Sequence, residues 1–272
     1  MIHVYCLTAN QLSLLNLTGL TLDAVSLQLP AGAYTTLRAI DWDRIIGLSA
    51  HVQRLVDSHA LVHNERPLDP AGIRAALRTI LAREKLPAAR LRITAPFDGD
   101  SIYIGIEPYE AYSPECYTRG VRCKTIRLSR EWPRAKLTGF IAPSRAAKAD
   151  SDPDIHELLI VDADDRILEG TSSNFFAVMN EKLYTAGDGV LEGVTRGLVL
   201  AEAASIVPVI YKAIILVDLA CVTEAFITSS SRDVMPVIRI DQIAIGSGQP
   251  GPITQALMAR YRAHLRLASE IA

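Results

Sequence analysis

Lysine is scarce in this chain, so each lysine is worth considering as a source of amine chemistry. A lysine amine in a buried or cation-flanked position has a lowered pKa, and it can then attack a carbonyl carbon or carry a proton. Only six residues can supply such an amine: Lys85, Lys124, Lys136, Lys148, Lys182 and Lys212.

Two other segments have residue types suited to a bound anion. Gly193-Val194-Thr195 is predicted to open a helix, whose first backbone N–H groups and positive dipole end suit a phosphate. Arg54, on another predicted helix, has the forked guanidinium that binds phosphate through paired hydrogen bonds. Taken singly, these features are common in helices and predict no function.

Composition excludes several function classes. The 28 basic and 30 acidic side chains give a net charge of −2, so no basic field predicts nucleic-acid or membrane binding. No histidine pairs with a cysteine at zinc-site spacing, which argues against a metal site. The four cysteines lack a C-x-x-C pair and are predicted to be reduced thiols. The N-terminus lacks signal-peptide features and the apolar runs are too short for a membrane span, so a cytoplasmic location is expected.

The elements that must position these residues form two predicted domains. In the first, residues 1–110, strand-like runs include 33–40, and helices are expected from Ser49 and over 67–81, with Asp69 as N-cap. A segment rich in Pro, Tyr and Glu then marks the boundary. The second domain, residues 117–272, alternates strands with short helices and is expected to end in a helix over 253–268. Because many strands are joined by tight turns, the pattern favours an α+β fold over a doubly wound sheet.

Several separated blocks resemble the fold-type IV pyridoxal-phosphate enzymes, the class IV aminotransferase family. This family includes branched-chain aminotransferases, D-amino acid aminotransferases and 4-amino-4-deoxychorismate lyases. The matching blocks are, in chain order, 32–38, 49–55, 157–162, 166–176, 183–185, 191–196, 224–230 and 235–237. The resemblance covers nearly the whole chain, and it implies a smaller N-terminal α/β domain and a larger C-terminal β-rich domain.

The resemblance implies pyridoxal 5′-phosphate as cofactor. It assigns Lys136 as the Schiff-base lysine and general base, and Glu169 as the carboxylate that keeps the pyridine nitrogen protonated. It also implies cofactor contacts from Arg54, Leu191, Gly193, Val194, Thr195, Ser229 and Ser230. Ser229 or Ser231 could replace Ser230 in its contact with the phosphate.

Lys136 has a rival in Lys148, whose neighbours superficially resemble the lysine segment of some branched-chain aminotransferases. In the family, a helix and a full strand separate the lysine from the glutamate. The 33 residues from Lys136 to Glu169 hold both elements, whereas the 21 residues from Lys148 do not. Lys136 is therefore the predicted anchor, and Lys148 is predicted to be a solvated helix residue.

The chain departs from the family pattern in two places. The tyrosine and asparagine often found shortly after the lysine are missing, because Gly139, Phe140 and Ile141 stand there. The Arg-Gly pair that binds a substrate carboxylate in lyases and D-amino acid enzymes is absent from 94–99. Tyr34 and Arg232 are candidate substrate contacts, with Arg232 binding a carboxylate or else pairing with Asp233 on a surface loop.

The predicted function is that of an aminotransferase acting on an amino acid and keto acid pair, in a homodimer as the family implies. A 4-amino-4-deoxychorismate lyase, which eliminates pyruvate, is the alternative within the family. A binding protein that has lost the cofactor is a third alternative, motivated by the two departures.

Overall fold

The computed structural model describes residues 2–9, 11–17, 19, 21–62 and 67–272, and it divides into two compact units. Unit 1 comprises Met1–Glu110, Ala135–Pro143 and Leu265–Ala272, and unit 2 comprises Ala111–Arg134 and Ser144–His264. Within the described part of the chain, no helix is long and apolar enough to cross a bilayer.

These units differ from the predicted domains in two segments. Residues 135–143, which contain Lys136, were expected in the second domain but belong to unit 1. The C-terminal helix ends at His264 and not at 268, and the chain then forms a strand of the unit 1 sheet. The physical reason is the same in both cases: each segment pairs with backbone of the first unit.

Unit 1 is built on a seven-stranded sheet, counted over the described residues, in the order β17-β4-β3-β5-β6-β1-β2. Its strands are β1 (His3–Thr8), β2 (Gln11–Leu15), β3 (Gly32–Ile40), β4 (Arg44–Ile46), β5 (Ala89–Pro96), β6 (Ile102–Pro108) and β17 (Ser269–Ile271). Its helices are α1 (Leu22–Ser26), α2 (Leu48–Val62) and α3 (Pro70–Glu84), with a 3-10 turn at Thr138–Phe140.

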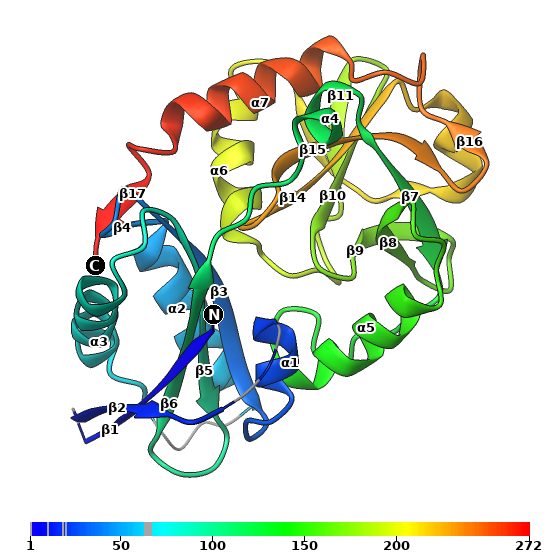
Figure 1. Ribbon diagram of the computed structural model, residues 1–272. Helices are drawn as coiled ribbons and strands as arrows, with labels where there is room; N and C mark the ends of the chain where they lie inside the picture. The colour runs from blue at the N-terminus through cyan, green and yellow to red at the C-terminus, as the bar shows by residue number, and fades with distance from the viewer. Residues whose placement is uncertain (1, 10, 18, 20, 63–66) are drawn as a thin grey trace. The chain divides into compact units, whose positions relative to one another are not determined.

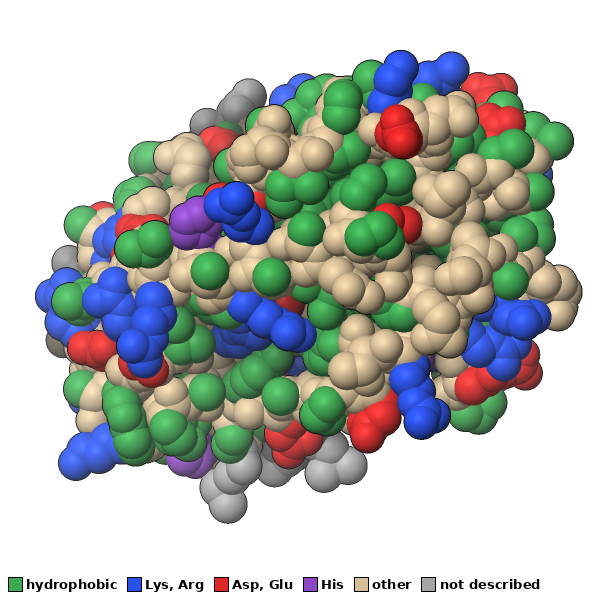
Figure 2. Space-filling view, turned by 90° about the horizontal axis from the view of Figure 1, so that it is seen from above, with side chains coloured by type: hydrophobic (Ala, Val, Ile, Leu, Met, Phe, Trp, Pro, Cys, Tyr) green, Lys and Arg blue, Asp and Glu red, His purple; other side chains and the backbone are tan. Residues whose placement is uncertain are grey.

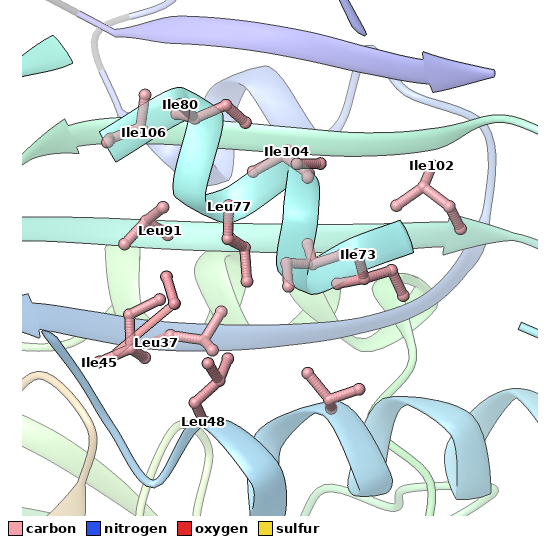
Figure 3. Close-up of a cluster of buried hydrophobic side chains, with 14 of the residues drawn as sticks. Leu37, Ile45, Leu48, Ile73, Leu77, Ile80, Leu91, Ile102, Ile104 and Ile106 are labelled. Atoms are coloured by element: carbon pink, nitrogen blue, oxygen red, sulfur yellow. The ribbon is translucent and has the colours of Figure 1, made fainter. Parts of the chain in front are cut away.

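Alternation along the strands gives this sheet one apolar face. Leu37 on β3 lies opposite Leu91 on β5, and Ile93 lies opposite Ile104 on β6, so these side chains share a face. Helices α2 and α3 cover that face, and Figure 3 shows Leu48, Leu77 and Ile80 meeting the strand residues. The other face carries Tyr34, Thr36, Arg38, Arg90, Arg92 and Thr94.

The helix starts follow their sequence signals in one case and not in the other. Asp69 caps α3 as predicted, since its carboxylate accepts the Ala71 N–H at 2.9 Å, and Pro70 occupies the first turn. Ser49, predicted to cap α2, lies inside that helix, and its hydroxyl and N–H both bind Glu270 on β17. That partner lies 221 residues away, so local sequence could not reveal it.

Helix α1 has no counterpart in the sequence prediction. Its Asp23 binds Arg92 at 2.6 Å and its Leu22 side chain packs over Gly105, on the face opposite α2 and α3. Five residues are too short for the hydrophobic period of a helix to be recognised.

Unit 2 is built on a ten-stranded mixed sheet of the described residues. Its strands are β7 (Val121–Ile126), β8 (Ile155–Val161), β9 (Arg166–Gly170), β10 (Asn174–Met179), β11 (Lys182–Thr185), β12 (Val209–Tyr211), β13 (Ile214–Ile215), β14 (Glu224–Ser229), β15 (Asp233–Ile240) and β16 (Ile243–Ala244). Its helices are α4 (Pro114–Thr118), α6 (Val194–Ala203) and α7 (Pro252–His264), with a 3-10 turn at Leu216–Cys221. Helix α5 (Ile141–Ala149) contains the change of unit, between Pro143 and Ser144.

The sheet of unit 2 closes on itself. The path β10-β14-β15-β7-β8-β9 returns to β10 through the pairing of Glu169 with Asn174 (Figure 1). On the face of β10 and β14 that also carries Asn174 and Thr228, Phe176 and Phe226 stack with ring centroids 4.7 Å apart. The closing pair therefore brings a predicted site residue, Glu169, next to the start of β10.

The molecular surface has no single sign of charge on the face seen in Figure 2. Basic and acidic side chains alternate there with hydrophobic and uncharged ones. This agrees with the near-zero net charge of the sequence.

Candidate active site

Lys136 is held by unit 1 on both sides of its backbone. Its N–H donates to Ser58 Oγ of α2 at 3.1 Å, and its carbonyl accepts the Tyr34 N–H of β3 at 2.8 Å. The next residue, Leu137, forms a β-bridge with Ala33. The lysine thus lies on a short extension of the sheet, and not on a free loop.

The Lys136 amine lies over an aromatic ring. Its Nζ is 4.8 Å from the centroid of the Tyr34 ring, and the Arg92 guanidinium is also 4.8 Å from that centroid. Arg92 is fixed in turn by Asp23 and by Ser26, whose Oγ accepts from it at 2.9 Å. Tyr34, a predicted substrate contact, therefore lies against the Lys136 amine and orients it through a cation–π contact.

Arg54 forms a polar group with two neighbours in unit 1. Its Nη2 donates to Thr35 Oγ1 at 2.9 Å and lies 3.2 Å from His51 Nδ1, which is 2.9 Å from Thr35 Oγ1. Burial, with the Arg54 and Lys136 cations, holds the pKa of His51 well below its usual range, so the ring is neutral. Burial lowers the pKa of Arg54 to about 10. Among the described residues, no carboxylate pairs with this guanidinium, which suits it to an anion.

Glu169 in unit 2 is buried, and both of its carboxylate oxygens are engaged. Oε1 pairs with Arg130 Nη1 at 2.9 Å, and Oε2 accepts from Asn174 Nδ2 and the Leu191 N–H, each at 3.1 Å. The guanidinium favours the ionised carboxylate, and the two N–H donors orient it.

The N-terminus of α6 approaches the same group closely. Gly193 is the N-cap and makes no side-chain cap, so the first N–H groups of the helix are not capped by this residue. An added Cβ at Gly193 would lie 2.1 Å from Asn174 Oδ1, so only glycine fits here. Asn174 also donates to the Leu191 carbonyl at 2.7 Å. Leu191 and Gly193 therefore lie against Glu169 and Asn174, and the Thr195 side chain in the first turn of α6 is buried.

The remaining predicted residues lie at the turn between β14 and β15. Ser229 ends β14, and its hydroxyl accepts the Arg232 N–H at 3.2 Å, with Ser230 in the turn between them. Helix α6 packs against β14. The Arg232 guanidinium binds Glu157 on β8 at 3.1 Å, so the predicted surface pairing with Asp233 is not the one found.

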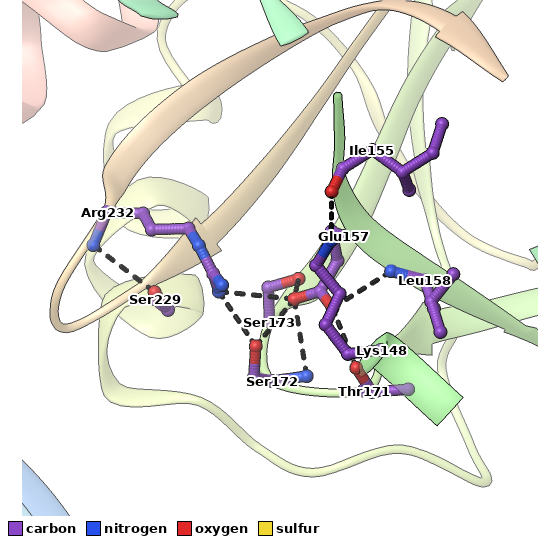
Figure 4. Close-up of polar contacts among 9 residues, drawn as sticks. All are labelled: Lys148, Ile155, Glu157, Leu158, Thr171, Ser172, Ser173, Ser229 and Arg232. Atoms are coloured by element: carbon purple, nitrogen blue, oxygen red, sulfur yellow. Dashed lines mark hydrogen bonds and ion pairs between the residues drawn. The ribbon is translucent and has the colours of Figure 1, made fainter. Parts of the chain in front are cut away.

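Lys148 is not the solvated residue that was predicted. Its amine donates to the Ile155 carbonyl (Figure 4). It also donates to Ser151 Oγ, just after the end of α5. The short loop to β8 folds back over the helix end, which explains the difference. Because this amine is occupied by a backbone carbonyl, the structure gives Lys148 a local structural role.

Sequence reasoning missed three residues of this region. Asn174 lies in the matching block 166–176, so the sequence did indicate it. Its contact with Glu169 was not predicted from that block. Thr228 likewise lies in the matching block 224–230 but was not singled out, and Arg130 lies in no matching block. Thr228 lies opposite Asn174 in the β10–β14 pair, so both side chains point to the same face.

These features fit a phosphate-bearing cofactor with a ring nitrogen. Among the described residues, Thr228 Oγ1 is buried without a hydrogen-bond partner, as expected where a polar ligand completes a site. Unit 2 also holds the buried Glu169 carboxylate beside Arg130 and a helix N-terminus without a side-chain cap. In unit 1, the Arg54 guanidinium pairs with no described carboxylate.

Comparison with known proteins decides the family. Residues 32–240 match the family described as amino-transferase class IV. The chain belongs to this family. It is an aminotransferase, and pyridoxal phosphate is its cofactor. The predictions of family, fold class, enzyme class and cofactor are thereby confirmed.

Two curated relatives illustrate the match. The branched-chain-amino-acid aminotransferase of Pseudomonas aeruginosa is 25% identical over 253 residues, which cover 85% of this chain and 82% of the relative. The D-alanine aminotransferase of Bacillus licheniformis is 38% identical, but over only 96 residues, 34% of each chain.

Solved structures share the fold. The branched-chain amino acid aminotransferase of Escherichia coli has a TM-score of 0.78 at 20% identity, covering 96% of this chain and 94% of that one. The branched-chain aminotransferase of Thermoproteus uzoniensis with norvaline has a TM-score of 0.82 at 23% identity, covering 97% and 95%.

Proposed function

We propose that this aminotransferase uses Lys136 as the covalent anchor of pyridoxal phosphate and as the base that moves the substrate Cα proton. The supporting observation is the double fixation of the Lys136 backbone by Ser58 and Tyr34, which leaves the amine over the Tyr34 ring. A proton carrier must be held in position to act at one carbon atom. The amine of the rival, Lys148, donates to the backbone carbonyl of Ile155.

The other residues bind and orient the cofactor in this proposal. Glu169, which pairs with Arg130, would lie against the pyridine nitrogen and keep it protonated. The N–H groups of Val194 and Thr195 and the hydroxyls of Thr195 and Ser230 hold the phosphate, with Ser229 supporting the turn. Arg54 adds a guanidinium to the same phosphate, since no described carboxylate neutralises it.

Bound pyridoxal phosphate supplies an electron sink for the negative charge that develops at the substrate Cα. Lys136 Nζ would take the proton from the substrate Cα and, in transamination, would supply it to the bound cofactor, whereas elimination does not need this transfer. The neutral His51 keeps the Arg54 and Thr35 group in one arrangement by accepting hydrogen bonds.

We propose branched-chain amino acids as the amino donors. The support is the length of the match to the Pseudomonas aeruginosa enzyme, which extends over most of both chains. The D-alanine enzyme matches over a third of the chain, so D-alanine is the competing substrate. Both of these relatives are aminotransferases, and no observation here favours the lyase.

The test begins with the absorbance spectrum of the purified protein, before and after borohydride reduction. We expect a visible band that borohydride bleaches, with the label on the peptide of Lys136. Lys136→Ala is expected to lose the label and activity, while the matched control Lys148→Ala keeps both. Label on Lys148 overturns the assignment of the anchor, and no band with added cofactor overturns the proposed function.

A substrate panel then separates the remaining alternatives. Transamination of L-leucine, L-isoleucine and L-valine with 2-oxoglutarate supports the proposal, whereas activity confined to D-alanine contradicts it. Release of pyruvate from 4-amino-4-deoxychorismate identifies the lyase.

We also propose that the enzyme is a homodimer in the cytoplasm, as the family resemblance implies. Light scattering on the purified enzyme is expected to give twice the mass of the chain, 29.6 kDa for one copy. A monomer at micromolar concentration contradicts the dimer, and cell fractionation tests the location.

A further inference from the structure

The Arg232 side chain turns into unit 2 and forms a buried ion pair. Its Nη1 lies 3.1 Å from Glu157 Oε2 and donates to Ser172 Oγ at 2.8 Å. The side chains of Arg232 and Glu157 are 15% and 2% exposed, and the guanidinium lies over the Tyr112 ring. A group this enclosed is shielded from solvent, so both charges depend on their protein partners.

Glu157 binds every residue of the turn that joins β9 to β10 (Figure 4). Its oxygens accept from Thr171 Oγ1 at 2.7 Å, Ser172 Oγ at 2.7 Å and Ser173 Oγ at 2.9 Å. Burial alone raises the pKa of Glu157, but Arg232 and these hydroxyls outweigh it and hold the pKa below its usual value. The turn 171–173 separates Glu169 from Asn174, so Glu157 fixes the connection between two residues of the candidate site.

Arg232 fixes a second turn, residues 229–232. Its N–H donates to the Ser229 carbonyl and to Ser229 Oγ, both at 3.2 Å, and its carbonyl accepts the Tyr117 hydroxyl at 3.1 Å. With its guanidinium on Glu157, Arg232 is held at both the backbone and the side chain. The Glu157–Arg232 pair therefore links the 171–173 turn to the turn that contains Ser230.

The space around this link leaves little freedom. A Cβ at Gly170 would lie 2.2 Å from Ser173 Oγ and 2.8 Å from Glu157 Cγ, so the carboxylate is packed directly against the β9 backbone. A buried ion pair adds little net stability over apolar packing, and this one joins residues of two separate turns. The pair is suited to holding the 171–173 and 229–232 turns in a fixed position relative to each other.

We propose that Arg232 and Glu157 are positioning residues that hold the 229–232 turn in the geometry that binds the cofactor phosphate. This inference rests on the proposed function, in which Ser230 contacts the phosphate. It replaces the sequence hypothesis that Arg232 binds a substrate carboxylate, because Glu157 already neutralises the guanidinium.

The test uses Arg232→Gln, Glu157→Gln, the double variant and the charge-conserving Arg232→Lys in the full chain. Arg122→Gln is the matched control, since Arg122 pairs with Asp154 on the same unit but is exposed. Four quantities are measured: the Kd of the cofactor-free protein for pyridoxal phosphate, its Kd for inorganic phosphate, and KM and kcat for the amino donor. Hydrogen–deuterium exchange of peptides over 171–174 and 229–233 reports the turns directly, whatever the activity.

We expect each single Gln variant to weaken both Kd values about tenfold and to speed exchange in both turns. The double variant should be no weaker than either single variant, because the pair acts as one unit. Arg232→Lys should recover most of the affinity, and Arg122→Gln should match the wild type.

Two results overturn the inference. If Arg232→Gln raises only the KM for the amino donor while Glu157→Gln raises nothing, Arg232 contacts the substrate directly. If both variants keep wild-type affinity and exchange, the pair does not position the turn. Failure of the proposed function is seen separately, as a wild-type protein that binds neither the cofactor nor phosphate, and it overturns this inference too.

Discussion

Replacing Gly193 by alanine should damage the site through Asn174. Backbone strain is not the reason, because Gly193 has φ −67° and ψ 138°, which alanine adopts easily. The new Cβ would lie 2.1 Å from Asn174 Oδ1, whereas ordinary contacts are 3.4 Å or longer. Asn174 must therefore move by more than about 1 Å, and its hydrogen bonds to Glu169 and to the Leu191 carbonyl cannot both survive.

Two costs, overpacking and a lost hydrogen bond, determine the expected loss in the free energy of unfolding. Overpacking a filled site costs about 1–3 kcal/mol, and losing a hydrogen bond to a charged group costs about 1.5–3 kcal/mol. Partial relaxation keeps the sum near 3 kcal/mol, which corresponds to a fall in Tm of roughly 6–12 °C for a chain of this size. The Kd for pyridoxal phosphate should rise as well, because Asn174 orients Glu169.

The assay compares Gly193→Ala with Gly197→Ala, a glycine one turn later in the same helix. A Cβ at Gly197 meets nothing within 4 Å, so this variant should gain about 0.5–1 kcal/mol from helix propensity. Urea unfolding of both cofactor-free proteins measures the difference. A Gly193→Ala protein within about 0.5 kcal/mol of wild type, or the same sign of change in both variants, would refute the packing argument.

Three further perturbations test other parts of the structure. Because the pKa of His51 is lowered on folding, the unfolded chain binds more protons, and the free energy of unfolding should fall below pH 6.5 by up to about 1.4 kcal/mol per pH unit. Urea unfolding at pH 7.5 and 5.5 should show a smaller difference between the two pH values for His51→Gln than for the wild type. The same difference in both proteins contradicts the role of His51. Arg130→Met leaves buried Glu169 without its guanidinium and should cost about 3–5 kcal/mol in urea unfolding; a loss under about 1 kcal/mol means that the other donors suffice. Deleting Leu265–Ala272 removes β17 and the three hydrogen bonds that the Arg44 and Arg78 side chains make to this segment, so unit 1 should lose about 3 kcal/mol, at about 1 kcal/mol per bond. Unchanged melting of the truncated protein would show that β17 is not part of the unit 1 fold.

Local sequence determined the elements whose signals are local. The Asp69 cap and Pro70 predicted the start of α3 correctly, and the alternation over 33–40 predicted β3 to within a residue. The family blocks predicted the fold class and the cofactor, because the order of short motifs survives where overall identity is low. Glu169 and Gly193 were named from these blocks alone.

Only the tertiary structure decided which distant segments pair. The Lys136 segment joins β3, and β17 joins β4 more than 220 residues away in sequence. Arg130 lies beside Glu169, and Arg232 lies on Glu157 rather than Asp233, without any sequence spacing that could announce it. The physical reason is that helix caps and strand alternation depend on neighbours within a few residues. A buried charge instead takes whichever partner the packed chain brings within hydrogen-bond distance.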